Sequence, residues 1–499
     1  MGLLTSCSNN DSFSSLPDLS PGVVTPTANP LVAEYNISLS QAAQVYVQFG
    51  VDTTYGFDTS AIAIPAAGGG VTILVAGMKA STTYHMRAVV TYSDGATQDD
   101  SDHTFTTGTV DATRIPQVQV SVPAGSTPAS GIELACLSLG NANQFVLAAF
   151  DPQGNLVWYY DYNLALGIPN PAKLLQNGHL LLVLSGNSWP SPGGEIEEID
   201  LAGNIIRQFS VADLNQWLAA AGFQITVYSV NHDILSLPNG HLILLASEYR
   251  TFNNLTGYPG QTNVLGNDII DLDPNDKPVW VWSAFDHLDV NRHPMLFPDW
   301  THANALAYSQ DDGNLLLSLR HQNWVIKIDY ENGSGSGNIL WHLGYEGDFT
   351  LDSDNPADWF YAQHDASILS PNSTGDFTLG VFDNGDDRVL DSSGTLCGSL
   401  GAQACYSRAA IVEVNEANMT AQVSWANTVP YSSWGGVTQL LPSGNVFIDD
   451  NNPIDNPFGA HVFEVTHDQS PETVWELNFV SQTSYRTIHL PSLYPGVQW

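Results

Sequence analysis

The chain has 499 residues, with 51 Asp and Glu against 13 Lys and Arg, which gives a formal net charge of −38. This charge argues against binding to nucleic acid, which needs Lys and Arg to replace counterions, and against electrostatic docking on anionic lipid. Hydrophobic residues make up 43% of the chain, enough for a large core. The length is too great for one ordinary domain. The 42 Gly and 28 Pro, with few long helical patterns, indicate a turn-rich, all-β protein.

Residues 1–21 form a polar N-terminal segment that we interpret as a tether. Within it, the stretch LTSC ending at Cys7 resembles the lipobox of bacterial lipoproteins, in which the Cys is acylated after signal cleavage. A signal needs a basic start and an apolar run, and only six residues precede Cys7, so we expect the true start to lie upstream. The segment predicts export to the bacterial cell envelope, in the periplasm or as an outer-membrane lipoprotein, with a possible lipid anchor through Cys7.

Residues 22–110 carry alternating strand patterns separated by Gly, Asp and Ser turns, namely QVYVQFG, VTILVAG, TYHMRAVVTY and HTFTTG. Short strands at this spacing are typical of a small β-sandwich. The stretch TTYHMRAVVTYSDG resembles a fibronectin type III (Ig-like) domain, with Tyr84 in the place of that family's characteristic tyrosine. The region contains no cluster of catalytic residue types, so we predict a spacer or an interaction module.

Residues 115–499 contain two kinds of repeat. One is a strand led in by a Gly or Asn turn, as in LLQNGHLLLVLS, LSLPNGHLILLAS, DDGNLLLSLR and LLPSGNVFID. The other is an apolar-acidic strand, a turn and then a Val-Trp-like strand, and its six turns are centred near residues 154, 203, 275, 334, 417 and 468. Each copy predicts an antiparallel meander that cannot cover its own apolar face, so radial packing of such sheets would bury them all. Six copies therefore predict a six-bladed β-propeller.

The propeller repeats are longer than a minimal blade of roughly 40–45 residues, so the surplus must form loops. Loops on a rigid ring carry functional sites. The richest are WSAFDHLDVNRHPMLFPDW and WHLGYEGDFTLDSDNPADWFYAQHD, whose aromatic residues could line a pocket.

The four cysteines give a partial indication of compartment. Cys397 and Cys405 lie in the stretch LCGSLGAQAC, close enough in sequence to close a small loop, and an oxidised pair fits an exported protein. Cys136 lies in the apolar stretch GIELACLS and is expected to be a buried strand residue. The chain contains no CxxC metal pattern.

Three of the 14 histidines share a sequence context. His232, His302 and His364 each precede the turn that leads into the next strand, which predicts equivalent strand starts in three successive blades. The innermost strands of a propeller begin at the central channel, so these side chains are expected to converge there. Arg320 follows the strand LLLSL and could turn back to the same channel. Four histidines are left undecided (His287, His293, His321 and His489), and the other seven are expected to be structural.

Three imidazoles and one guanidinium permit three readings. Imidazoles alone suggest a zinc or iron site, but a permanently charged Arg320 would repel a cation and favours a tetrahedral oxyanion such as sulfate or phosphate. Imidazole is also a nucleophile and a general acid or base. Oxyanion group transfer, a metal site and a structural polar cluster remain open from the residues alone.

The segments NHDILSLPNG, THANALAYSQDDGNLLLSLRHQNWVIKID and QHDASIL resemble the bacterial arylsulfate sulfotransferase family, which does not use the nucleotide sulfate donor. The resemblance covers residues ~130–499 and includes the YSR stretch at Tyr406 and the segment SYRTIHLPSLYP. It implies a six-bladed propeller after a β-sandwich, and a ping-pong transfer of a sulfuryl group from a phenolic sulfate ester to another phenol. It also implies that His364 is the nucleophile that becomes sulfohistidine. His232, His302 and Arg320 would bind the sulfuryl oxygens and assist the phenol.

The expected partners are small phenols and aryl sulfates, and the chemistry requires neither a metal nor a cofactor. Two alternatives remain: an aryl sulfate hydrolase, in which water replaces the acceptor, and a propeller that binds a ligand without turning it over. A dry, aromatic pocket would favour transfer over hydrolysis. The aromatic residues near the site motifs in sequence are Trp300, Trp324, Trp359, Phe360 and Tyr361.

Overall fold

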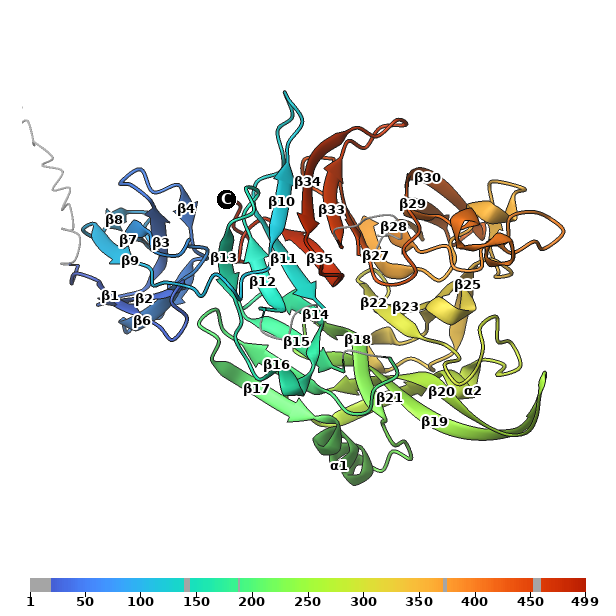
Figure 1. The fold of residues 1–499 in the computed structure, drawn as a ribbon. Coiled ribbons are helices and arrows are strands. Elements are labelled where there is room, and N and C mark those ends of the chain that lie inside the picture. Colours follow the sequence, from blue (N-terminus) through green and yellow to red (C-terminus); the bar gives the residue numbers. More distant parts are fainter. Residues whose placement is uncertain (1–18, 139–143, 187–188, 371–374, 452–458) are drawn as a thin grey trace, which may run out of the picture. The chain divides into compact units, whose positions relative to one another are not determined.

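The computed structural model describes residues 19–138, 144–186, 189–370, 375–451 and 459–499 (Figure 1). Cys7, the predicted anchor, lies outside the described residues. The chain divides into two compact units, Met1–Thr109 with Trp499, and Val110–Gln498. No helix in the described ranges is long and apolar enough to cross a membrane.

The first unit contains two antiparallel sheets. Its strands alternate buried and accessible side chains, as in β2, where Ala33, Tyr35 and Ile37 are buried and the residues between them are less so, which is the pattern of a sheet with one face in a core. Tyr84 lies in β7, and its hydroxyl accepts a hydrogen bond from the backbone N–H of Lys79 at 3.0 Å. One sheet consists of β1 (Val23–Pro26), β2 (Ala33–Leu39) and β6 (Gly69–Val75), and the other of β3 (Ala43–Gly50), β4 (Phe57–Asp58), β5 (Ile62–Ile64), β7 (Thr83–Tyr92), β8 (Thr97–Asp99) and β9 (His103–Thr106).

The second unit contains six sheets, each built on four antiparallel strands. The first sheet joins the two ends of the unit, because β35 (Ser484–Leu490) pairs with β11 (Ile132–Leu137). The other strands of the first three sheets are β12 (Leu147–Phe150) and β13 (Leu156–Tyr159); β14 (Ile168–Leu174), β15 (Leu180–Ser185), β16 (Glu195–Ile199) and β17 (Ile205–Ser210); and β18 (Ser229–Ser236), β19 (Leu242–Leu255), β20 (Tyr258–Leu272) and β21 (Pro278–Ser283).

The last three sheets follow the same order, and two of them carry an extra edge strand. They consist of β22 (Ala303–Ser309), β23 (Asn314–Leu319), β24 (Trp324–Ile328) and β25 (Ile339–Gly344); β27 (His364–Ser370), β28 (Asp376–Asp383), β29 (Ser407–Asn415) and β30 (Thr420–Val429), with β26 (Thr350–Leu351) parallel to β30; and β31 (Val437–Leu440), β32 (Val446–Asp450), β33 (His461–Val465) and β34 (Thr473–Phe479), with β10 (Val118–Ser121) beside β34.

Helices are short and lie in the connections. The longest, α1 (Val211–Ala221), starts at a capping box between Ser210 and Asp213 and ends at the left-handed Gly222. The others are α2 (Ala284–His287) and the 3-10 turns η1 (Leu164–Leu166), η2 (Arg320–Gln322), η3 (Glu331–Gly333), η4 (Pro356–Asp358), η5 (Cys397–Leu400) and η6 (Ala402–Ala404).

The six apolar-acidic repeats coincide with the hairpins formed by the third and fourth strands of each meander, from β12–β13 to β33–β34. The residues of the turns explain why these hairpins could be predicted from the sequence. Gly154 and Gly203, at φ 81° and 86°, occupy the left-handed position that such turns need.

Each sheet buries its faces against its neighbours in chain order. The first strands make successive contacts, from β35 to β14, β18, β22, β27 and β31, and β31 in turn contacts β35 (Figure 1). Apolar clusters lie between neighbouring sheets; one of them joins Trp282 and Val264 of the third sheet to Leu317 and Ile326 of the fourth. Burial of such side chains contributes roughly 1.5–3 kcal/mol each, so the sheets depend on one another for stability.

Candidate active site

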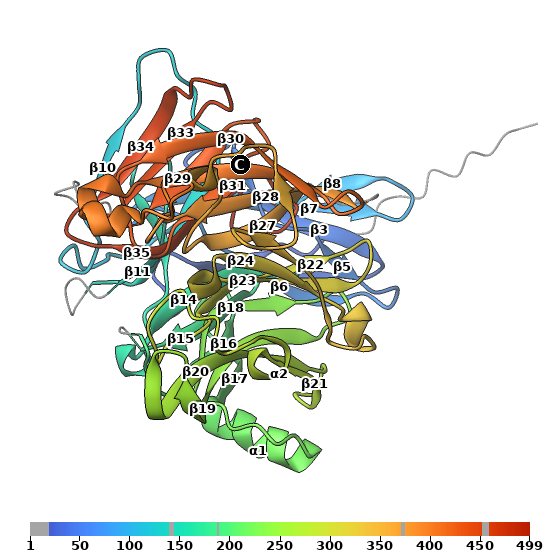
Figure 2. The ribbon, with the colours of Figure 1, turned by 90° about the vertical axis from the view of Figure 1, so that its right-hand side faces the viewer.

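The three histidines singled out in the sequence lie at the starts of neighbouring strands. His232 is in β18, His302 directly precedes β22, and His364 is the first residue of β27. These strands contact one another in that order, and Figures 1 and 2 place them side by side. The contact between strand starts brings together residues that are 62 to 132 positions apart in the sequence.

Each of these strands departs from regular pairing close to its histidine. The register shifts between Val230 and Ile234, between Ala303 and Ala305, and between His364 and Ser367. His232 and His302 also adopt left-handed backbone conformations, with φ of 63° and 44°. Such bulges re-aim side chains, and strained backbone of this kind clusters at functional sites.

The imidazoles are buried and close together. The ring centroids of His232 and His302 are 4.7 Å apart, and those of His302 and His364 are 6.5 Å apart. Their exposed fractions are 8%, 9% and 1%. Tyr485 of β35 completes the group, with its ring 5.7 Å from that of His232 and 6.3 Å from that of His364. The three sequence-predicted histidines therefore form one cluster.

Arg320 directly follows β23, and the pairing of β22 with β23 places it beside His302. Its backbone N–H donates to the carbonyl oxygen of His302 at 3.2 Å. The guanidinium Nη2 donates to Asp386 Oδ2 at 2.5 Å and to the carbonyl oxygen of Ser433 at 2.9 Å, while Nη1 contacts His321. The Nε–H of Arg320 is buried and has no hydrogen-bond partner among the described residues. That donor remains available to an anion.

An asparagine fixes the orientation of His364. The side-chain nitrogen of Asn384 donates to the carbonyl oxygens of Ser432 (2.7 Å) and Gly435 (3.1 Å). Its oxygen must then face His364, and it accepts a hydrogen bond from Nδ1–H at 2.7 Å. With Nδ1 protonated, the lone pair of the neutral ring is on Nε2. The Nδ1 atoms of the other two imidazoles face Asn231 Oδ1 (2.6 Å, from His232) and Asp299 Oδ2 (2.5 Å, from His302).

The imidazoles stay neutral at physiological pH. Burial, and then the charge of Arg320, hold the pKa of both His364 and His302 well below 6.5. Burial and then His302 do the same for the pKa of His232, and burial lowers the pKa of His321 to about 3. A neutral imidazole whose Nε2 carries a lone pair can act as a nucleophile.

Several residues of the cluster were not found in the sequence. Asp299 accepts hydrogen bonds from His302 and, at 2.7 Å, from the indole N–H of Trp189, whose ring lies 4.7 Å from that of His232. Asp299 lies only three residues before His302, which was the available signal. Trp189 comes from the loop after β15 and had none.

The aromatic residues expected near the site lie elsewhere. Trp300 and Trp324 belong to the apolar cluster between the third and fourth sheets, and Trp359, Phe360 and Tyr361 to the one between the fourth and fifth. Of the four undecided histidines, His321 joins the site. The others make separate contacts, with Trp282 for His287, with Tyr258 and Phe297 for His293, and with Glu133 for His489.

Asp299, His302 and His321 also have the donor atoms of a metal site. Their candidate ligand atoms lie within 4.8 Å of one another, and two imidazoles with one carboxylate are a known ligand set for iron. The guanidinium of Arg320 contacts His321, however, and its fixed positive charge would repel a cation at this position. The donor set therefore fits a metal less well than it fits an anion.

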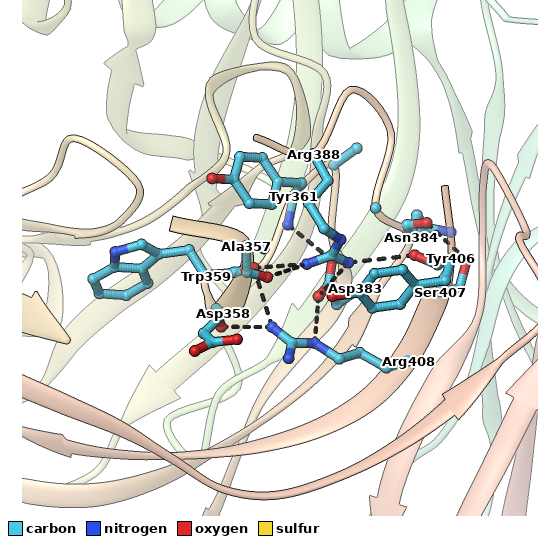
Figure 3. Close-up of polar contacts among 12 residues, drawn as sticks. Ala357, Asp358, Trp359, Tyr361, Asp383, Asn384, Arg388, Tyr406, Ser407 and Arg408 are labelled. Atoms are coloured by element: carbon cyan, nitrogen blue, oxygen red, sulfur yellow. Dashed lines mark hydrogen bonds and ion pairs between the residues drawn. The ribbon is translucent and has the colours of Figure 1, made fainter. Parts of the chain in front are cut away.

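A buried ionic cluster holds the segment that leads to His364 (Figure 3). Arg388, fully buried, donates to the carbonyl oxygens of Ala357 and Trp359 at 2.9 Å each and to Asp383 Oδ2 at 2.8 Å. Arg408 donates to the same carboxylate oxygen at 2.7 Å. Asp383 is followed directly by Asn384, so this cluster fixes both His364 and its hydrogen-bond acceptor.

The connection between β28 and β29 carries Asp386 and Arg388 near its start and a covalent link near its end. Cys397 and Cys405 form a disulfide, as their spacing suggested. The backbone N–H of Cys397 donates to the carbonyl oxygen of Arg388 at 2.9 Å, which ties the disulfide to the ionic cluster.

An all-β scaffold that gathers neutral imidazoles around one guanidinium suits the binding of a small anionic group and nucleophilic attack on it. The sequence comparisons agree. The model of the arylsulfotransferase (ASST) family matches residues 119–486, and the chain belongs to this family. A curated relative, the arylsulfate sulfotransferase AssT of Escherichia coli O6:H1, is 24% identical over 322 residues, which cover 51% of this chain and 48% of that protein. The matched region thus spans about half of the relative's length.

Two solved structures match the chain at low similarity. They are hydrazine synthase of Kuenenia stuttgartiensis (13% identity, TM-score 0.25, 64% of this chain and 79% of that chain) and an auxiliary nutrient binding protein of Bacteroides ovatus (10% identity, TM-score 0.31, 91% and 86%). At these TM-scores neither bears on the activity.

Replacing Arg388 with Met should destabilise the protein strongly. The substitution leaves Asp383 buried with one cationic partner fewer and removes the Arg388 donors from the carbonyl oxygens of Ala357 and Trp359, of which only Trp359 keeps a donor in Arg408. We therefore expect a loss of roughly 3–5 kcal/mol in the free energy of unfolding, measured in urea. The matched control is Arg114→Met, which breaks a half-exposed pair with Asp161 and should cost about 1 kcal/mol or less. Equal losses would contradict the assignment.

His364 should also make stability depend on pH. Its pKa in the folded protein lies below the unfolded value of about 6.5, so under that pH the unfolded chain holds a proton that the folded chain lacks. The stability of the wild type should therefore fall relative to His364→Gln as the pH drops, by about 1.4 kcal/mol per pH unit. Urea unfolding of both proteins between about pH 7.5 and 5 measures the difference, and a constant difference would contradict it.

Proposed function

We propose that this protein is an arylsulfate sulfotransferase, which moves a sulfuryl group from a phenolic sulfate ester to another phenol through a sulfohistidine. The observation that carries the proposal is the orientation of His364: Asn384 holds Nδ1–H, and the Nε2 lone pair is left free at low pKa next to the charge of Arg320. Family membership supports transfer between aryl groups. The named activity of the Escherichia coli relative agrees with it.

In the first half of the reaction, Nε2 of His364 attacks the sulfur and the bond from sulfur to the phenolic oxygen breaks. Arg320, through Nε–H, and the imidazoles stabilise the three sulfuryl oxygens. The bound anion and Asp299 both favour the protonated form of His302, so His302 gains a proton as the ester binds and gives it to the departing phenolate.

In the second half, the acceptor phenol gives its proton to His302 and its oxygen attacks the sulfur. The bond between Nε2 of His364 and sulfur breaks, the new ester leaves, and the free imidazole is restored. Protons and charge balance over the two halves.

The same proposal assigns residues 115–499 to a six-bladed propeller, with blades formed by the six antiparallel sheets. The support is the circuit of contacts between first strands and its closure by β35 on β11. Residues 22–110 are assigned to a fibronectin type III-like sandwich. The support there is Tyr84, whose hydroxyl binds the backbone a few residues upstream, as the tyrosine corner does.

We further propose that the protein works in the cell envelope of a bacterium. The disulfide between Cys397 and Cys405 supports an oxidising compartment. A lipid anchor at Cys7 rests on the resemblance of residues 4–7 to a lipobox.

The transferase is tested with a chromogenic aryl sulfate and an excess of phenol. We expect the rate of chromophore release to rise with phenol concentration. When phenol is omitted, mass spectrometry should show a sulfuryl adduct of about 80 Da on His364. His364→Ala should abolish both.

The alternatives give different results. Release that does not respond to phenol would identify a sulfatase, and no release from several donors would identify a propeller that only binds its ligand. His342→Ala is the matched control, because His342 lies in β25 and pairs with Asp348, away from the cluster.

Asn384→Leu should separate orientation from binding. The variant frees the His364 ring to change tautomer, so we expect kcat to fall about 10²-fold while KM for the donor changes little. Asn384→Asp, which keeps an acceptor for Nδ1–H, should recover part of the loss. A KM effect alone would contradict the positioning role.

A further inference from the structure

The net charge of the site does not favour strong binding of a highly charged anion. Arg320 is the one permanent cation described within the cluster, and it is paired with Asp386, while a second carboxylate, Asp299, is hydrogen-bonded to His302. With the imidazoles neutral, the group has one negative charge in excess. The neighbouring charged layer, with Lys173, Arg486, Asp233 and Asp365 in contact, is balanced and does not change this.

Asp386 is held firmly at this place. Its two oxygens are 2.5 Å from Arg320 Nη2 and 2.7 Å from the hydroxyl of Tyr431, and its side chain is only 12% exposed. Burial raises the pKa of Asp386 above its ordinary value, with Asp387 and Asp383 adding to the rise, whereas Arg320 and Tyr431 favour the charged form. The carboxylate is therefore a fixed part of the site that faces the guanidinium.

Shape alone cannot tell a sulfate ester from a phosphate ester, because both present three terminal oxygens on a tetrahedral centre. Charge can. A sulfate monoester carries one negative charge, whereas a phosphate monoester gains its second near pH 6. A site in which one guanidinium is already neutralised by a carboxylate disfavours the second charge.

We propose that Asp386 is the residue that makes this site select the charge of the group it binds, admitting the monoanionic group of an aryl sulfate and rejecting the dianionic group of an aryl phosphate. The inference rests on the proposed function, since it concerns the same site. It adds a substrate class that is excluded and the residue responsible.

Binding of two inert probes tests this without any turnover of sulfate. Benzenesulfonate is a monoanion at all relevant pH values, and phenyl phosphate changes from mostly monoanion to dianion between about pH 5 and about pH 8. Calorimetry on the full chain should show phenyl phosphate binding weaken by about tenfold or more over this range relative to benzenesulfonate. Because the charge of benzenesulfonate is constant, any change in its binding with pH reports titration of protein groups such as Asp386, Asp299 and the four imidazoles. Comparison with it therefore isolates the effect of the second charge on phenyl phosphate.

Asp386→Asn should bring phenyl phosphate binding at the higher pH back to within about threefold of the sulfonate. Asp386→Glu keeps the charge and should keep the discrimination. Asp387→Asn removes an exposed charge from the same loop and should leave it unchanged. Thermal unfolding of each variant identifies any that is misfolded. If Asp386→Asn is misfolded, the pH dependence of probe binding is compared between the wild type and Asp386→Glu.

Three results would overturn the inference: equal binding of both probes by the wild type at the higher pH, discrimination that survives in folded Asp386→Asn, or no binding of either probe. Failure of the transferase proposal looks different. In that case the probes bind with the expected pH pattern, and the aryl sulfate assay shows neither release nor an adduct on His364.

Discussion

The pairing of β35 with β11 is the contact on which the second unit depends. It completes a four-stranded sheet from residues about 350 positions apart and covers the face that the sixth sheet would otherwise leave bare. The same strand delivers Tyr485 against His232 and His364, and Arg486 against Asp233 and Asp365. The pairing that joins the two ends of the unit therefore also brings Tyr485 and Arg486 to the site, and it supplies the rigidity that the proposed attack by His364 requires.

Burial sets the chemistry of the cluster. Removing the imidazoles from water makes their charged forms costly, and the guanidinium of Arg320 adds to that cost, so the free site holds neutral rings. The left-handed backbone at His232 and His302 is tolerated because packed sheets on either side fix it. In the reaction proposed above, a bound anion brings negative charge next to His302 and favours its protonated form. Binding of the ester would thus supply the proton that the leaving phenolate needs.

The antiparallel meanders could be predicted from the sequence because their signals are local. A Gly turn, an apolar-acidic strand and a Val-Trp strand lie within about 20 residues of one another. The sequence also identified His232, His302 and His364, which occupy equivalent positions before such turns, and Arg320, which follows the strand LLLSL. Asn384 and Trp189 could not be found in this way, since each acts through a loop whose approach is set by packing between sheets. The aromatic residues next to the site motifs were misleading for the same reason: neighbours in sequence, such as Trp300, face the opposite side into the core.

The few arginines of this chain have different roles. Arg388, Arg408 and Arg486 are buried and donate hydrogen bonds to carboxylates and carbonyl oxygens of the scaffold. Arg320 has a buried Nε–H without a partner among the described residues, as Arg388 and Arg486 also have, but its guanidinium contacts His321 of the histidine cluster. The strongly acidic surface cannot attract an anionic ester from a distance, so affinity must come from short hydrogen bonds and aromatic contact inside the site. Under the proposed function, such a site favours a weakly charged, aryl-bearing group over a highly charged one, and the proposed role of Asp386, paired with Arg320, is to strengthen that preference.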